Sequence, residues 1–137
     1  MRHFIFASHH RLAEGLKDTV QFLTGDQTDI HDLCCYLDGD SQPVEEKVSA
    51  LMEGWDPEDE VVILADLLGG SVYQKFYPYL NEHRHLLCGM NLPLAMTLVL
   101  EPEGSLTSQR VNEIVNEARN ALVYVNDLSS DDDEEDE

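Results

Sequence analysis

Short apolar runs alternate with amphipathic segments along the chain, and this alternation predicts a series of strands and helices. The run VVILA at 61–65 is continuously apolar, as expected of a parallel strand that is buried on both faces. The segment 11–24 instead places its three leucines and Val20 at helical spacing ahead of Gly25, which favours an amphipathic helix. Pro78 is expected to distort or end early a helix that starts near Ser71.

The same patterns predict the order of the elements. In chain order they are a strand over 2–8, a helix over 11–24, a strand over 30–37, a helix over 42–54, a strand over 61–66, a helix over 71–80, a strand over 84–89, a helix from Pro93, a helix over 107–120 and a strand over 121–125. Successive strand and helix units predict an α/β fold, with a mainly parallel central sheet flanked by helices on both faces.

The chain length fits one domain, which we expect over 1–128. Residues 129–137 are only serine and acidic residues, which cannot bury enough apolar surface to repay their ordering entropy. We therefore expect a disordered acidic tail there. No apolar run approaches the ~20 residues of a membrane span, and the first residues do not resemble a secretion signal. These features favour a cytoplasmic location.

The formal net charge is −20 at pH 7, with eight lysines and arginines against 28 acidic residues. So few cations argue against nucleic-acid binding through phosphate neutralisation, and they favour a basic partner. The three cysteines lack the CxxC spacing of zinc or redox sites and are expected to be reduced thiols in the core. His83 and His85 would share one face of a strand, but no third ligand follows, so no metal site is predicted. His3 and His31 are expected at strand ends or on the surface.

Candidate chemistry gathers just beyond the predicted strands, where ligands collect in open parallel sheets. His9 follows the first strand and offers a nucleophilic ring nitrogen near neutral pH. Asp66 ends the third strand and would hold the other ring nitrogen. Gly70 allows close backbone approach, and Ser71 offers a hydroxyl at the head of a helix, so together they predict a phosphate-binding site. Because GGS also occurs in ordinary turns and a strand-end aspartate often caps a helix, this spacing alone leaves both interpretations open.

Three segments resemble one known family. ASHHRLAEG at 7–15 is similar to the SHG-x-x-A-x-G segment of the enzyme IIA domains in mannose-family sugar phosphotransferase systems (PTS). LADLLGGS at 64–71 resembles the D-L-x-G-G-S segment of that family, and GMNLP at 89–93 resembles its G-x-N-x-P segment. The three occur in the family's order, and the resemblance spans about residues 2–126.

The resemblance implies a histidine phosphocarrier. His9 would accept a phosphoryl group from a phosphohistidine carrier protein and pass it to a IIB domain, with Asp66 as the hydrogen-bonded partner of the ring and Ser71 at the phosphate. It implies no metal or organic cofactor, contact with the membrane only through the sugar permease, and a homodimer that exchanges a last strand at about 121–125. His10 and Val72 depart from the family pattern, which usually has glycine and proline at these positions.

Three alternatives remain open at this stage. A phosphocarrier subunit that serves dihydroxyacetone kinase shares the fold and a similar histidine segment, although the GGS segment favours the sugar system. A non-catalytic regulatory or binding protein would follow if His10 and Val72 have weakened transfer. A metal-dependent hydrolase built on His9, His10 and Asp66 is the weakest alternative, because adjacent residues point their side chains apart on any regular element.

Overall fold

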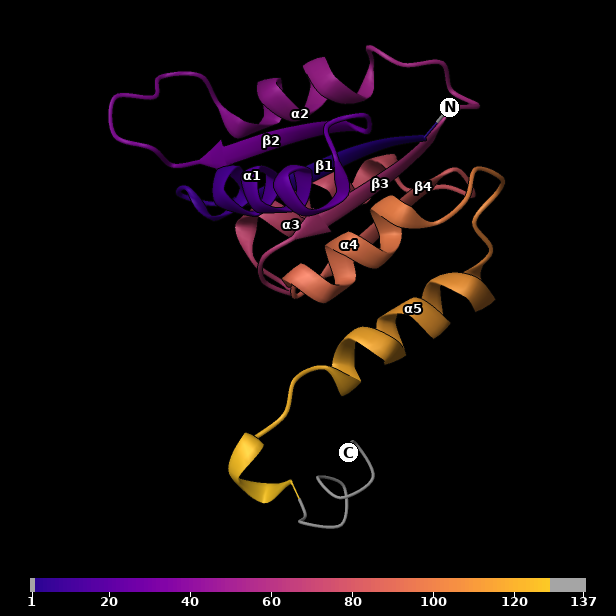
Figure 1. The fold of residues 1–137 in the computed structure, drawn as a ribbon. Coiled ribbons are helices and arrows are strands. Elements are labelled where there is room, and N and C mark those ends of the chain that lie inside the picture. The colour runs from indigo at the N-terminus through magenta and orange to yellow at the C-terminus, as the bar shows by residue number, and fades with distance from the viewer. Residues whose placement is uncertain (1, 129–137) are drawn as a thin grey trace.

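The computed structural model describes residues 2–128, whose central element is a four-stranded parallel sheet (Figure 1). In sheet order its strands are β2 (Asp29–Cys35), β1 (Arg2–His9), β3 (Glu60–Ala65) and β4 (Arg84–Cys88). Each neighbouring pair runs parallel. The predicted α/β fold with a mainly parallel sheet is confirmed, and the predicted acidic tail over 129–137 lies outside the described residues.

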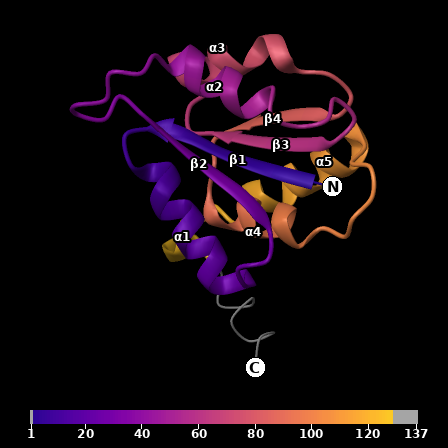
Figure 2. The same ribbon diagram turned by 90° about the horizontal axis from the view of Figure 1, so that it is seen from above.

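Helices cover both faces of the sheet (Figure 2). One face carries α1 (Leu12–Thr24), α4 (Leu92–Leu100) and α5 (Ser108–Asn120), and the other carries α2 (Val44–Met52) and α3 (Ser71–Phe76). The short 3-10 helix η1 (Tyr77–Tyr79) follows α3, so Pro78 ends the third helix early, as predicted. None of the described helices is both long and apolar enough to cross a membrane.

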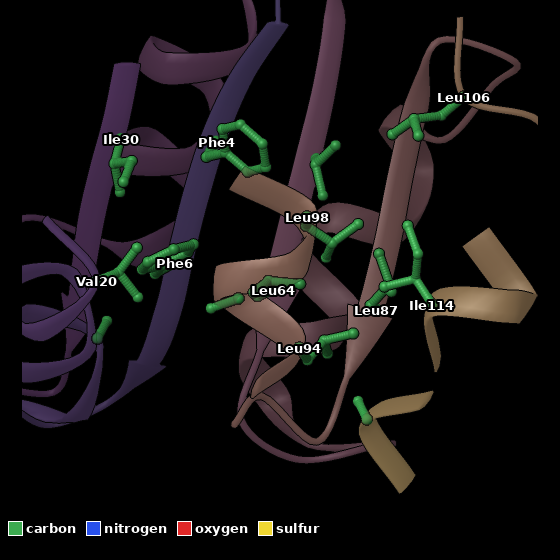
Figure 3. Packing of buried hydrophobic residues seen from close by; sticks show 14 residues of the cluster. Phe4, Phe6, Val20, Ile30, Leu64, Leu87, Leu94, Leu98, Leu106 and Ile114 are labelled. Atoms are coloured by element: carbon green, nitrogen blue, oxygen red, sulfur yellow. The ribbon is translucent and has the colours of Figure 1, made fainter. Parts of the chain in front are cut away.

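The central strands divide their side chains between two cores. Phe4 and Phe6 of β1 point to the side of α1, α4 and α5, where Figure 3 shows them packed with Val20, Leu64 and Leu98. The intervening residues of β1 and β3 face α2 and α3 instead; they are Ile5, Ala7, Val61 and Ile63. This two-residue period, with both faces covered, explains why β3 is apolar without interruption.

The connections from β1 position the candidate site. The chain passes from β1 through α1 to β2 on one side of β1, whereas β3 pairs with its other side. The strand order therefore reverses at β1. In open parallel sheets the crevice at such a reversal, beyond the carboxyl ends of the strands, is the usual ligand site. His9 ends β1 and Asp66 directly follows β3, so both lie at this point.

A buried ion pair lies at the end of the sheet opposite to His9 and Asp66. Arg2 is 6% exposed, and its Nε donates a hydrogen bond to Glu60 Oε1 at 2.7 Å. The same guanidinium donates to carbonyl oxygens in the loop 101–104, and Glu60 Oε2 accepts from the Leu106 amide. These bonds fasten the connection between α4 and α5 to the sheet.

His3 lies near the start of β1, as expected, but its side chain is buried rather than exposed. Its ring stacks on Trp55 with centroids 4.4 Å apart. Nδ1 lies 2.6 Å from Asp29 Oδ2, and Nε2 lies 3.0 Å from Asp59 Oδ2. The burial is possible because both polar edges of the ring meet carboxylates from neighbouring segments.

The expectation of a fifth strand at 121–125 is wrong for the single chain. After α5 these residues run without regular structure into the 3-10 helix η2 (Val125–Asp127), and Figure 1 shows the segment, in yellow, leaving the body of the fold. A strand needs a neighbour for its amide and carbonyl groups, and this segment pairs with none of the described strands. Its apolar side chains are exposed, with Leu122 at 85% and Tyr124 at 66%.

Candidate active site

His9 is the last residue of β1, and its side chain is half-buried at 40% exposure. A carboxylate holds its ring at Nδ1. Nδ1 lies 2.9 Å from Asp66 Oδ2, which also accepts the His9 backbone amide at 2.8 Å. Because a carboxylate can only accept, Nδ1 carries the proton in this arrangement, and in the neutral form of the ring the lone pair is on Nε2. Nε2 is therefore the ring atom that is available to act as a nucleophile.

Asp66 is fixed by three hydrogen bonds and is only 10% exposed in its side chain. Besides the two bonds from His9, its Oδ1 accepts the Leu67 amide at 2.9 Å. Burial alone would raise the pKa of Asp66, but the hydrogen bonds from the amide and ring of His9 outweigh it and hold that pKa below the usual value of an aspartate. The carboxylate is consequently ionised at neutral pH and faces the imidazole as a negative charge.

The Nε2 edge of the imidazole lies beside the start of α3. Ser71 Oγ lies 3.4 Å from His9 Nε2, at the outer limit of a hydrogen bond. Gly70 sits against the ring, since a side-chain carbon added there would lie 3.6 Å from His9 Cε1. Gly69 adopts φ +75°, which strongly favours glycine and turns the chain from β3 into α3. The structure thus brings together the four site residues predicted from the sequence: His9, Asp66, Gly70 and Ser71.

Comparison with known proteins assigns the chain to a family. The sequence profile of a family described as the PTS system fructose IIA component matches residues 3–117, most of the chain. The chain belongs to this IIA family. It is thus a IIA-type component of a sugar phosphotransferase system, and the resemblance to mannose-family IIA domains noted in the sequence is confirmed.

Solved structures support the same assignment. A Klebsiella pneumoniae protein, described as a phosphoenolpyruvate-dependent sugar PTS permease, is 35% identical, with a TM-score of 0.84 and 92% of each chain covered. The PTS IIA protein associated with the fucose utilization operon of Streptococcus pneumoniae is 26% identical, with a TM-score of 0.78 over 91% of this chain and 93% of its own. A mannose/sorbose-specific IIA subunit from Enterococcus faecalis, at 22% identity and a TM-score of 0.72, covers 94% of this chain and 97% of its own and shares the fold.

The departures from the family pattern have structural consequences at the site. His10, in place of the usual glycine, adopts φ +55°, a left-handed conformation that a side chain disfavours. Its amide is fixed by a 2.7 Å hydrogen bond to the Cys35 carbonyl, and its exposed side chain stands beside the site. Val72, in place of the usual proline, is fully buried, and α3 still begins at Ser71.

The third family segment, GMNLP at 89–93, caps a helix. Asn91 Oδ1 accepts the Leu94 amide at 2.8 Å and so caps the start of α4, with Pro93 in the first turn. Gly89 adopts φ +83° just before it. The GMNLP segment therefore turns the chain from β4 into α4, and the role of Asn91 is to cap that helix.

Tyr36 contacts the site and was missed by the sequence analysis. Its ring lies 5.4 Å from that of His9 between centroids, tilted by 31°, and its hydroxyl is 2.9 Å from Ser71 Oγ. The predicted second strand ran to residue 37, whereas β2 ends at Cys35, so Tyr36 is the first residue beyond the strand. The signal that found His9 and Asp66, a position just past a strand end, would have found Tyr36 if that boundary had been set correctly.

The thiols at the ends of β2 and β4 are not activated as nucleophiles. Burial raises the pKa of Cys35 to about 11, so this thiol stays protonated at neutral pH. Burial likewise raises the pKa of Cys88 at the end of β4. Within residues 2–128 no group of three or more histidine, cysteine and acidic side chains is arranged to hold a metal ion.

Proposed function

We propose that this chain is a cytoplasmic phosphocarrier of a sugar phosphotransferase system. His9 accepts a phosphoryl group from a phosphohistidine carrier protein and passes it to a IIB domain for sugar uptake. The domain that does this spans about 1–128. The observation that carries the proposal is the difference between the two ring nitrogens: Asp66 engages Nδ1 at 2.9 Å, whereas Nε2 faces the Ser71 hydroxyl at 3.4 Å and the side chain is 40% exposed.

The arrangement suits transfer without a cofactor. The lone pair of His9 Nε2 attacks phosphorus as the P–N bond of the donor breaks, and that electron pair returns to the donor's ring nitrogen. The proton on Nδ1 stays in its hydrogen bond to Asp66. The phosphorylated ring carries positive charge, which the adjacent carboxylate stabilises, so catalysis is mainly positioning and electrostatics.

Ser71 supplies the contact for the transferred group. Its hydroxyl lies on the Nε2 side of the ring, where the phosphoryl oxygens would be. A hydroxyl that donates to an anionic oxygen forms a charge-assisted hydrogen bond, stronger than a neutral one. Gly70 leaves room at Cε1 for the group to approach. Ser71 and Gly70 are accordingly the proposed phosphate-binding residues.

Charge favours a basic partner surface. The chain carries a formal charge of −20, so a donor with a positive patch around its phosphohistidine would be steered toward it. The same complementarity applies to the IIB domain that receives the group. We infer that both partners present cations around their reactive residues.

The test is intact-mass spectrometry after incubation with phosphoenolpyruvate, enzyme I and the histidine carrier. Wild type is compared with His9→Ala and with two matched controls, His10→Ala beside the site and His83→Ala away from it. We expect an acid-labile phosphoryl adduct on wild type and both controls, and none on His9→Ala. An adduct lost only in His10→Ala would move the acceptor to that residue. No adduct on wild type, with the partners shown to be active, would support the regulatory alternative instead.

We also propose that the chain forms a homodimer through the segment after α5. The exposed apolar side chains of this segment support it; they are Leu122, Val123, Tyr124 and Val125. Pairing with a sheet edge of a second copy would cover these side chains and satisfy the backbone. In sedimentation at micromolar concentration, wild type should be a dimer and Val123→Asp should be a monomer. A monomeric wild type would refute this assembly.

A further inference from the structure

Tyr36 occupies an unusual backbone position at the rim of the site. It has φ +63°, in the left-handed region that bulky residues rarely adopt. His10 and Tyr36 are the two residues other than glycine with positive φ in the described part of the chain, and both flank His9. Backbone conformations of this kind tend to persist where the surrounding structure enforces them, often at functional sites.

The ends of β1 and β2 fix the point at which the chain turns at Tyr36. His9 aligns with Cys35 in the sheet, and the His10 amide donates to the Cys35 carbonyl at 2.7 Å. Cys35 itself is fully buried. Tyr36 therefore leaves the sheet at a fixed point, and its ring lies beside the imidazole of His9.

Three side chains form a polar chain from this position to the nucleophile. The Tyr36 hydroxyl is 2.9 Å from Ser71 Oγ, which is 3.4 Å from His9 Nε2. Each hydroxyl has a single proton. If Tyr36 donates its proton to Ser71 Oγ, the proton of Ser71 is left to point at Nε2 or at a phosphoryl oxygen bound there. Without Tyr36, Ser71 is free to rotate that proton toward water.

We infer that Tyr36 is a positioning residue for phosphoryl transfer, acting through Ser71. Its hydroxyl orients the Ser71 proton toward the phosphoryl group on His9, and its ring restricts the tilt of the imidazole. This role rests on the proposed phosphocarrier function and adds to it a residue outside the three family segments. It also gives a reason for an aromatic side chain at a strained position.

A double-mutant cycle tests the role. Tyr36→Phe keeps the ring and removes the hydroxyl, Ser71→Ala removes the residue through which Tyr36 acts, and the double variant combines them. Tyr77→Phe, which removes the hydroxyl of an exposed tyrosine in η1, is the matched control. Single-turnover transfer from the phosphorylated histidine carrier is followed by intact mass at rising carrier concentration, which separates the transfer rate from the saturation constant.

We expect Tyr36→Phe to slow the transfer step about two- to tenfold, the factor of one ordinary hydrogen bond, with the saturation constant unchanged. In the Ser71→Ala background the same substitution should cause no further loss. Equal losses in the two backgrounds, or a Tyr36→Phe rate equal to wild type, would overturn the role of Tyr36 while wild type still accepts phosphate. A wild type that takes up no phosphoryl group would overturn the proposed function, and the role of Tyr36 with it.

Discussion

Replacing Asp66 with asparagine tests the central claim about His9. The wild-type carboxylate accepts three N–H groups: the His9 amide, His9 Nδ1 and the Leu67 amide. An asparagine side chain has one oxygen and one NH₂ group, so it cannot accept all three. In its best orientation the oxygen faces His9, and the NH₂ group is left facing the Leu67 amide.

The magnitude follows from those contacts. Two hydrogen bonds from His9 change from charge-assisted to neutral, which costs about 2–3 kcal/mol in the free energy of unfolding. During transfer the ring of His9 becomes positive, and in the variant no negative charge faces it. The loss of this stabilisation raises the barrier by about 1.5–3 kcal/mol. That penalty corresponds to a rate roughly 10- to 150-fold lower.

Two measurements check this reasoning. Urea unfolding of wild type and Asp66→Asn gives the stability difference, and single-turnover transfer from the phosphorylated carrier gives the rate. Because the pKa of Asp66 lies below its usual value when folded, its ionisation stabilises the wild type above about pH 4. That contribution is lost as the pH falls through the folded pKa, so the two stabilities should converge in acid. An Asp66→Asn rate within twofold of wild type would refute the proposed role of the carboxylate.

Three further predictions follow from other features. Arg2→Met removes the arginine that pairs with buried Glu60, which keeps the Leu106 amide and His85 beside it, and should lower the free energy of unfolding in urea by about 3–5 kcal/mol, with transfer by the folded protein unchanged. His10→Gly should relieve the left-handed backbone and raise the same free energy by up to about 1 kcal/mol, with the phosphoryl adduct retained. Added salt should lower the second-order rate of transfer from the carrier, because it screens attraction to a chain of charge −20, whereas the transfer step at saturation should be insensitive to salt.

The fold was largely predictable because its main signals are local. A continuous apolar run such as 61–65 suits a strand covered on both faces, and β3 is that strand. His9 and Asp66 could be placed at the same edge because both lie at carboxyl ends of strands in one parallel sheet. Their direct contact also requires β1 and β3 to be neighbours, and the sequence analysis did not predict the order of the strands. The motif segments then coincided with the turns after β1, β3 and β4.

The parts that sequence reasoning missed depend on distant contacts. The segment 121–125 has strong β-propensity, but whether it forms a strand depends on a pairing partner, which propensity does not encode. His3 is buried because Asp29 and Asp59 lie beside it, and they are 26 and 56 residues away in the sequence. Tyr36 leaves the sheet through a left-handed backbone that its residue type disfavours, so the apolar pattern carried the predicted strand too far.

Strand β1 carries a histidine paired with carboxylate at each end, and only one of the two is suited to nucleophilic chemistry. His3 is 4% exposed, is stacked on Trp55, and has a carboxylate oxygen within 3.0 Å of each ring nitrogen, so neither nitrogen is open to an incoming group. His9 is engaged at Nδ1 by Asp66 alone, and its Nε2 faces a hydroxyl at 3.4 Å. The pairing of histidine with aspartate is common to both sites. What separates the buried histidine from the proposed nucleophile is a ring nitrogen that no carboxylate within residues 2–128 engages, at the end of the sheet where the strand order reverses.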